Sequence, residues 1–298
     1  MTDLHIHTKY SDGSFSVIDI LKKAEKSNLE VISITDHDCV KAYNELSNLD
    51  IKEYYKGRII TGCEFKCVFT KYKLPVEILG YGFNYKEVEQ FLEQYSNMKI
   101  QKTYLEHIKT IGNQIGLIFN KDISIDDKKT EYASAIFEKE ILKNKENIKI
   151  LNKNGVSIET NFYRDAQSNP KSIFYIDETK DYLTPNIIID LIHKAGGIAF
   201  LAHPYIYKID NKLKVIEDFI NTYDIDGLEC YYSLFNEEET NNLLELCKKY
   251  NLYISGGTDF HGTNKPDIKL GIGKGKLNIS KNNIENWIYT AREENNKC

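Results

Sequence analysis

The sequence has few of the features that mark membrane, secreted or nucleic-acid-coating proteins. It contains no apolar run near the roughly 18–20 residues that a bilayer span requires, and it begins with a strand pattern rather than a signal peptide. Its six cysteines are scattered without a C-x-x-C pair, which is typical of reduced thiols in a cytoplasm. A formal net charge of −5 excludes a basic surface for wrapping duplex DNA or coating membranes. We therefore expect a cytoplasmic protein that binds neither duplex nucleic acid nor membranes.

The sequence also lacks the motifs of several common catalytic machineries. It has no G-x-S-x-G turn for a serine nucleophile, no phosphate-binding P-loop, and no G-x-G-x-x-G after its first strand. Arginine is scarce as well, with three among 298 residues. The absence of the three motifs favours a reaction in which no side chain of the protein attacks the substrate.

Histidines and acids stand instead at the ends of apolar strands. Asp3, His5 and His7 alternate with apolar residues, so in a β-strand all three polar side chains project to one face. Burying two imidazoles and a carboxylate together is costly unless a partner compensates for their lost hydration. A divalent metal ion does so, because zinc, manganese and iron accept imidazole nitrogen and carboxylate oxygen as ligands.

Four further segments repeat this pattern, each an apolar run that closes on His, Asp or Glu. They are residues 31–38, 58–64, 198–204 and 253–262. In parallel α/β barrels the carboxyl ends of separate strands meet at one face, where the active site lies. We therefore predict one metal site assembled from all five strand ends.

Helical patterns lie between these strands. Ser16 begins one helix with a capping-box pattern, Thr184 precedes a second that starts with proline, and residues 236–250 form a third. Two more predicted strands, 76–81 and 227–231, give seven strands that alternate with helices. This alternation predicts a parallel sheet with right-handed crossovers, and seven strands in a chain of this length suggest a barrel.

Residues 86–182 do not follow this alternation. They hold a helical run over 86–115 and a second helix over 130–145, with a polar stretch between them. Apolar residues at helical spacing in the first run indicate a small packed core rather than a disordered linker. We predict a helical insertion that follows the fourth strand, rises from the face with the strand ends and serves as a substrate lid. The barrel would comprise residues 1–85 and 183–298.

The order and spacing of the motifs resemble the polymerase and histidinol phosphatase (PHP) superfamily. The matching motifs are Asp3-x-His5-x-His7, Ser11-Asp12-Gly13, Thr35-Asp36-His37, Gly62-x-Glu64, Ala202-His203-Pro204 and Gly256-Gly257-Thr258-Asp259-x-His261-Gly262. The layout is most similar to stand-alone members with a helical insertion, some of which remove the 3′-phosphate of 3′,5′-bisphosphonucleosides or trim short RNA from its 5′ end. The resemblance implies an α/β fold, a distorted (β/α)7 TIM-like barrel that holds two or three divalent ions (Mn2+, Fe2+ or Zn2+).

The resemblance also implies the metal ligands. A first ion would take His5, His7, Glu64 and Asp259, a second would take Glu64 and His203, and a third would take Asp12, His37 and His261. The chain departs from its relatives in the fourth strand, where Glu77 stands in place of a histidine that binds the second ion. A carboxylate can still ligate, although it favours a harder ion such as manganese or iron. Asp3 and Asp36 resemble acids that orient the ligand imidazoles from behind.

Charge counting supports an anionic substrate. Five neutral histidines and four carboxylates contribute −4, against +6 from three divalent ions, so the pocket would be net positive inside an acidic protein. Bound metal ions lower the pKa of water to about 7 and so supply hydroxide near neutral pH. We therefore expect direct attack by water that the ions activate, with no protein nucleophile.

Three functions remain open. The first is a metal-dependent phosphoesterase that acts on a small nucleotide, such as a 3′,5′-bisphosphonucleoside, or on a short RNA end. The second is a small-metabolite phosphatase of the histidinol phosphate type, and the third is a non-catalytic regulator that binds metal or nucleotide. Arg164, the only arginine of the insertion, favours the first, because relatives use such arginines to hold a second phosphate and a guanidinium fits phosphate in a bidentate manner. The sequence makes no prediction of the oligomeric state.

Overall fold

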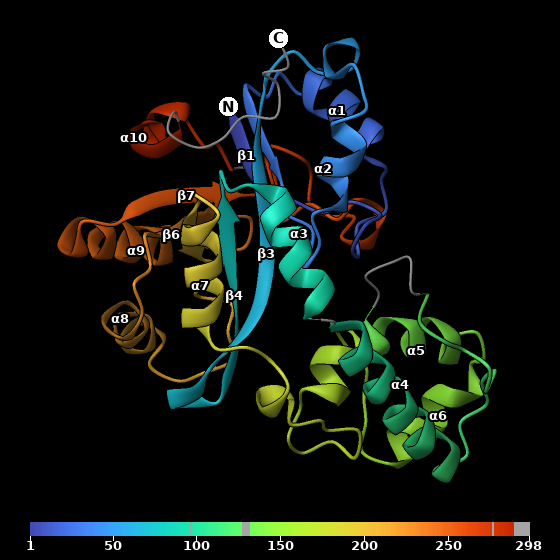
Figure 1. The fold of residues 1–298 in the computed structure, drawn as a ribbon. Helices are drawn as coiled ribbons and strands as arrows, with labels where there is room; N and C mark the ends of the chain where they lie inside the picture. Colours follow the sequence, from blue (N-terminus) through green and yellow to red (C-terminus); the bar gives the residue numbers. More distant parts are fainter. Residues whose placement is uncertain (96, 127–131, 276, 289–298) are drawn as a thin grey trace. The chain divides into compact units, whose positions relative to one another are not determined.

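The computed structural model describes residues 1–95, 97–126, 132–275 and 277–288 (Figure 1). The chain forms two compact units, which we call unit 1 (Met1–Gln94 and Tyr182–Cys298) and unit 2 (Tyr95–Asp181). Unit 1 contains the whole sheet, and the regular elements of unit 2 are helical. None of the described helices combines the length and the apolar character that crossing a membrane requires.

Unit 1 is built on a seven-stranded sheet whose strands follow one another in chain order. The strands are β1 (Thr2–Ile6), β2 (Val31–Ile34), β3 (Arg58–Phe69), β4 (Leu74–Tyr81), β5 (Ile198–Leu201), β6 (Gly227–Tyr232) and β7 (Tyr253–Gly257). The sheet is nearly closed, because the His7 N–H donates to the carbonyl of Phe260 at 2.9 Å and Ile6 pairs with Phe260 in a parallel bridge. The predicted α/β fold, a distorted barrel of seven strands with helices, is confirmed.

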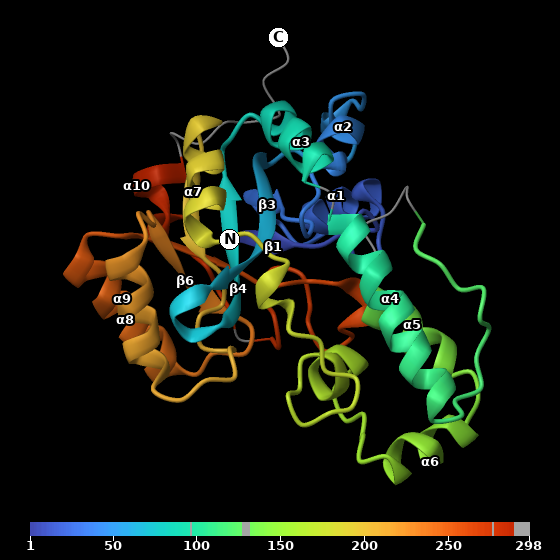
Figure 2. The ribbon, with the colours of Figure 1, turned by 60° about the horizontal axis from the view of Figure 1, so that its bottom comes forward.

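One strand runs opposite to the prediction. Alternation predicted a wholly parallel sheet, and this is wrong for β4, which pairs antiparallel with both β3 and β5. The cause is the length of β3, which continues past Glu64 to Phe69 and returns through a short turn at Thr70–Tyr72 (Figure 2). Such a connection joins only antiparallel neighbours, because a parallel crossover needs about a dozen residues.

Helices α1 (Val17–Lys26), α2 (Lys41–Leu46), α3 (Tyr85–Gln94), α7 (Pro185–Lys194), α8 (Lys212–Thr222), α9 (Glu237–Tyr250) and α10 (Glu285–Ile288) complete unit 1. Helices α1 and α9 begin with capping boxes, Ser16 with Asp19 and Asn236 with Glu239, in which each side chain satisfies a backbone N–H of the other residue. Helix α7 begins with Pro185, as predicted, and lies beside β4 in both views of the ribbon.

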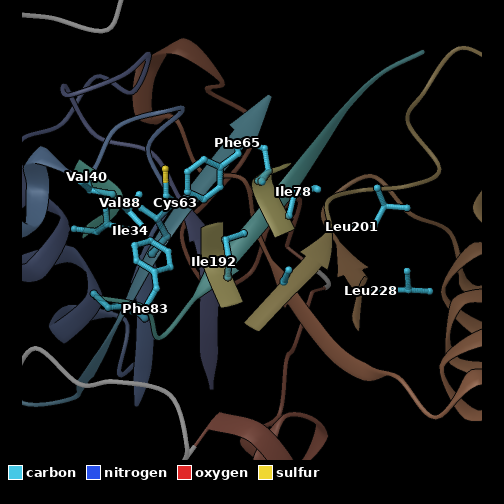
Figure 3. Close-up of a cluster of buried hydrophobic side chains, with 14 of the residues drawn as sticks. Ile34, Val40, Cys63, Phe65, Ile78, Phe83, Val88, Ile192, Leu201 and Leu228 are labelled. Atoms are coloured by element: carbon cyan, nitrogen blue, oxygen red, sulfur yellow. The ribbon is translucent and has the colours of Figure 1, made fainter. Parts of the chain in front are cut away.

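Apolar side chains from the sheet and its helices form the main core (Figure 3). Phe65 of β3 and Phe83 pack with ring centroids 6.2 Å apart, and Ile192 of α7 packs onto Gly80 of β4, where a Cβ atom would lie 2.9 Å from it. A separate cluster includes Trp287, which stacks on Tyr81. Burying each such side chain contributes about 1.5–3 kcal/mol to the stability of the fold. This packing holds in place the strands that end in the predicted ligands.

Unit 2 contains α4 (Asn97–Gln114), α5 (Ala133–Ile141), α6 (Glu146–Lys153) and a π-helical turn at Tyr163–Gln167. The helix predicted over 130–145 is present as α5, and the first residues of that prediction lie outside the described part of the chain. The run predicted over 86–115 is two helices, α3 in unit 1 and α4 in unit 2. Phe137, Phe162 and Phe174 form the centre of a separate core, so this region is a folded unit and not a linker.

Candidate metal centre

Five of the seven histidines gather with four carboxylates at one end of the barrel in unit 1. These nine residues are the predicted ligands His5, His7, Asp12, His37, Glu64, Glu77, His203, Asp259 and His261. Of the other two histidines, His107 is exposed and His193 pairs with Asp226 at 2.7 Å.

Three overlapping groups of ligand atoms lie within this cluster. We call them the inner group (His5, His7 and Glu64), the outer group (His7, Asp12, His37 and His261) and the edge group (His37, Glu64 and Glu77). Within each group all ligand atoms lie within 4.8 Å of one another, a spacing that suits a single divalent ion.

Glu64 connects the inner and edge groups. Its Oε2 atom lies 3.2 Å from one ring nitrogen of each of three histidines, His5, His7 and His37. Its Oε1 atom lies 2.8 Å from Nε2 of His203. A buried carboxylate whose two oxygens face different imidazoles is well placed to bridge two ions.

Asp259, Asp12 and Glu77 complete the set of carboxylates. Asp259 Oδ1 lies 3.4 Å from Nε2 of His7, and Asp12 Oδ1 lies 3.1 Å from Nε2 of His261. Glu77 Oε2 lies 3.3 Å from Nε2 of His203, so the glutamate in the fourth strand reaches the cluster. The antiparallel direction of β4 therefore still brings Glu77 to the same centre.

The backbone is unusual at two of these positions. His203 has φ 28° and Asp259 has φ 55°, which lie in the left-handed region that residues other than glycine rarely adopt. Such strain costs about 1–3 kcal/mol per residue and is found preferentially at active sites. Close approach of β7 to β1 also requires Gly257, because a Cβ there would lie 2.3 Å from that of His5. Together these features bring Asp259 to His5 of β1 and to His7, which directly follows that strand.

The donor atoms fit bound metal ions. Among the described residues, Glu64 Oε2 is buried and makes no hydrogen bond, although three imidazole nitrogens surround it. The Nε2 atoms of His5 and His7 face each other at 3.1 Å. Lone pairs that converge in this way repel one another unless a cation or protons lie between them.

The carboxylates also hold protons on the histidines. Burial lowers the pKa of His7, but the nearby carboxylates of Asp259 and Glu64 outweigh it and raise this pKa to about 9. Burial likewise opposes protonation of His5, and the carboxylates of Glu64 and Glu229 raise its pKa well above the usual value. An ion that binds here must displace these protons.

Comparisons with known proteins identify the family of the chain. A model of the PHP domain matches residues 3–235. The chain belongs to the PHP family. A 5′-3′ exoribonuclease of Haemophilus influenzae is 26% identical over 270 residues, which cover 87% of this chain and 89% of that protein. A phosphoribosyl 1,2-cyclic phosphate 1,2-diphosphodiesterase of Eggerthella lenta is 20% identical over 266 residues, 87% of this chain and 94% of that protein.

The fold of this PHP protein is also seen in a solved structure. A Bifidobacterium adolescentis protein that is predicted to be a metal-dependent phosphoesterase superposes with a TM-score of 0.68 at 20% identity, over 97% of this chain and 96% of the other. The chain is thus a metal-dependent phosphoesterase of the PHP family, which confirms the predicted enzyme class and sets aside the non-catalytic alternative.

Asp36 and Asp3, the two acids expected to orient the imidazoles of this PHP centre, accept hydrogen bonds from loop residues instead. Asp36 accepts hydrogen bonds from the backbone N–H of Thr8 at 2.7 Å and from the hydroxyl of Ser11 at 2.5 Å, and so holds the loop that carries Asp12. Asp3 accepts from both the N–H and the hydroxyl of Thr258, and burial raises its pKa to about 6. Within the described chain, neither carboxylate hydrogen-bonds to a ligand imidazole.

Glu229, which lies outside the motifs identified in the sequence, does contact an imidazole. Its Oε1 accepts from Nδ1 of His5 at 2.9 Å, and its Oε2 accepts from the backbone N–H of His203 at 2.7 Å. A carboxylate on the far nitrogen of a ligand imidazole fixes the tautomer and strengthens the metal-facing nitrogen as a donor. The sequence feature that could have identified Glu229 is its position inside the predicted buried strand 227–231, because a buried carboxylate is costly without a partner.

Asp259 is supported by two further side chains outside the motifs. Its Oδ2 accepts hydrogen bonds from the hydroxyl of Tyr232 and from the ammonium of Lys265, each at 2.6 Å. Its Oδ1 is thereby turned toward His5, His7 and His261. No pattern in the sequence distinguishes Tyr232 from the other tyrosines, and Lys265 stands only four residues after His261 in a loop.

Proposed function

We propose that the protein hydrolyses a phosphate ester of a small nucleotide, such as a 3′,5′-bisphosphonucleoside, or of the end of a short oligonucleotide. The observation that carries the proposal is the sharing of Glu64 between two ligand groups. Two ions that share a carboxylate can act on the same phosphate, as in two-metal phosphoester hydrolysis. The similarity to an exoribonuclease over most of both chains supports a nucleotide or RNA substrate.

The nine residues fit two or three divalent ions, with manganese, iron and zinc as the candidates. When bound, such ions acidify a water molecule and stabilise the charge that develops on phosphate oxygens. The chain itself orients the ligands: Glu229 keeps the proton of His5 on Nδ1, which leaves Nε2 as the donor. Asp36 fixes the loop before Asp12 through Thr8 and Ser11.

A panel of phosphoesters tests the substrate class. The protein would be loaded with manganese and tested on 3′,5′-bisphosphoadenosine, a 5′-phosphorylated RNA dinucleotide, phosphoribosyl 1,2-cyclic phosphate, histidinol phosphate and p-nitrophenyl phosphate. Chromatography would measure the products, which are phosphate from a monoester, a nucleoside monophosphate from the dinucleotide and a monoester from the cyclic diester. We expect the highest kcat/KM for the first two substrates and complete loss with a chelator. A clear preference for histidinol phosphate or the cyclic phosphate would favour the small-metabolite alternative, which the Eggerthella relative supports.

We further propose that Arg164 binds the second phosphate of a bisphosphonucleoside. Its side chain is exposed on the π-helical turn Tyr163–Gln167 of unit 2, and its fork of N–H donors matches phosphate oxygens. Arg164→Ala should lower kcat/KM for the bisphosphate roughly ten- to a hundredfold and leave p-nitrophenyl phosphate hydrolysis nearly unchanged. Lys171→Ala, an exposed cation of the same unit, is the control. Equal losses on both substrates would mean that Arg164 supports the fold or contacts the scissile phosphate.

A further inference from the structure

Lys265 lies in the loop after β7, directly behind a candidate metal ligand. Its Nζ is 2.6 Å from Oδ2 of Asp259, the carboxylate whose Oδ1 faces the ring nitrogens of the cluster. We infer that Lys265 also binds the phosphoryl group that is hydrolysed, as a protein contact additional to the ions. This inference rests on the phosphoester substrate proposed above.

The charge of Lys265 is unsuited to a residue that only supports a metal ligand. His5 is backed by a carboxylate, Glu229, which strengthens its donor nitrogen. Asp259 is backed by an ammonium, which competes with an ion for the negative charge of the carboxylate. The hydroxyl of Tyr232 would hold the same oxygen without that competition. An ammonium group next to bound metal ions is electrostatically favourable when an anion, such as a phosphate, contacts both the ammonium and the ions.

The side chain of Lys265 is partly exposed, and its ammonium has N–H groups that Asp259 does not use. The side chain is 37% exposed, whereas that of Asp259 is 7% exposed. Among the residues that the structure describes, Asp259 is its only side-chain partner, so two of its three N–H groups can reach an incoming oxygen. A phosphate at this edge of the centre could accept from Lys265 while it contacts the ions.

The loop that carries Lys265 is hydrogen-bonded to the loop that carries Asp12. The backbone N–H of Thr263 donates to the hydroxyl of Ser14 at 2.8 Å, and the side-chain amide of Asn264 donates to the carbonyl of Asp12 at 2.7 Å. These contacts hold the short helical turn Gly262–Asn264 against the loop of the outer group. Lys265 is therefore held beside the centre in advance, which lowers the entropic cost of ordering it around a ligand.

Binding of inorganic phosphate to the manganese-loaded protein tests this role. Calorimetry would compare the wild type with Lys265→Met, Lys265→Gln and Lys265→Arg, and elemental analysis would give the manganese content of each. We expect Met and Gln to weaken phosphate binding tenfold or more at unchanged manganese content, and Arg to retain most of the affinity. The two neutral variants differ in shape, so a folding defect in one leaves the other informative.

Two matched controls separate phosphate binding from metal support and from net charge. Tyr232→Phe removes the other hydrogen bond to Oδ2 of Asp259 and therefore measures the effect of weaker support for this ligand. We expect any loss of phosphate affinity in it to accompany a loss of manganese and to be smaller than in Lys265→Met. Lys249→Met removes an exposed lysine that pairs with Glu217 and should have no effect on phosphate binding.

The outcomes distinguish this inference from the proposed function. If neutral variants of Lys265 lose manganese while their loaded fraction binds phosphate normally, Lys265 only positions Asp259 and the inference fails. Unchanged phosphate affinity and manganese content in these variants would overturn it as well. A wild-type protein that binds no phosphate and hydrolyses no member of the panel would instead overturn the proposed function.

Discussion

The inner and outer ligand groups differ in how completely the protein encloses them. In the inner group the side chains of His5, His7 and Glu64 are at most 1% exposed. In the outer group the carboxylate of Asp12 is 36% exposed and the ring of His37 is 11% exposed. His5 and Glu64 of the inner group stand on strands and His7 directly follows β1, whereas Asp12 stands on a loop that Asp36 holds through side-chain contacts.

This difference suggests two kinds of ion site in one cluster. Buried ligands on strands keep their geometry and are shielded from water, so an ion of the inner group should bind tightly. Ligands on a solvent-open loop can rearrange, so an ion of the outer group should exchange more readily. The following predictions test that contrast, beginning with the largest expected effect.

Glu64→Ala should have the largest effect, because it removes one ligand from both the inner and the edge group. We expect a loss of at least one equivalent of metal and of several kcal/mol of transition-state stabilisation, roughly a thousandfold or more in kcat/KM. Elemental analysis and phosphate release would measure both effects. Glu217→Ala, which removes a partly buried acid of α8 that pairs with Lys249, serves as the control. Full metal content in Glu64→Ala would contradict the bridging role.

Asp12→Asn should affect the outer group alone. The amide keeps the shape of the side chain but removes its charge, so we expect one fewer ion and a loss of activity of roughly a hundredfold. Titration of the metal-free protein with manganese should still show the tight site. If the tight and weak sites were lost together, the two groups would not be separate.

Glu229→Gln should weaken the inner group without touching the outer one. Loss of a carboxylate behind a ligand imidazole typically lowers metal affinity roughly ten- to a hundredfold. We expect this change at the tight site, with the weak site unaffected, in the same manganese titration. An effect confined to the weak site would contradict the assignment of Glu229 to the inner group.

The dependence of metal affinity on pH should show that protons and ions compete for the shared ligands. The pKa of His7 in the metal-free protein is about 9, above the usual 6.5, so His7 is protonated at neutral pH and must release its proton when an ion binds. Manganese affinity should therefore rise by up to about tenfold per pH unit for each proton displaced, and the part due to His7 should level off above about pH 9. Calorimetry in buffers of different ionisation enthalpy would measure the released protons. Affinity independent of pH between about pH 7 and 9 would rule the competition out.

The candidate centre could be predicted from sequence because its signals are local. Each motif combines an apolar strand with a polar residue at its end, and parallel strands bring their ends together. The H-x-H spacing of His5 and His7 is enough to place both rings on one face of β1. Glu64, which the structure places between several imidazoles, could be identified in the same way.

Other parts of the structure depend on contacts that local sequence does not encode. The direction of β4 follows from how far β3 extends, and an apolar run does not reveal its own end. Glu229 contacts His5 across 224 positions of the chain, and Lys265 contacts Asp259 from a loop without regular periodicity. Strand alternation finds the ligands but not the residues that hold them.

The left-handed backbone at His203 and Asp259 has a consequence for the resistance of the protein to heat. Two such residues together cost roughly 2–6 kcal/mol, a large share of the 5–15 kcal/mol by which a typical domain is stable. Ions that bind only the folded state would raise the free energy of unfolding and so offset part of this cost, since a ligand stabilises the state that it binds. The melting temperature should consequently follow the supply of metal, and a cell that lacks the metal would lose the folded protein as well as its activity.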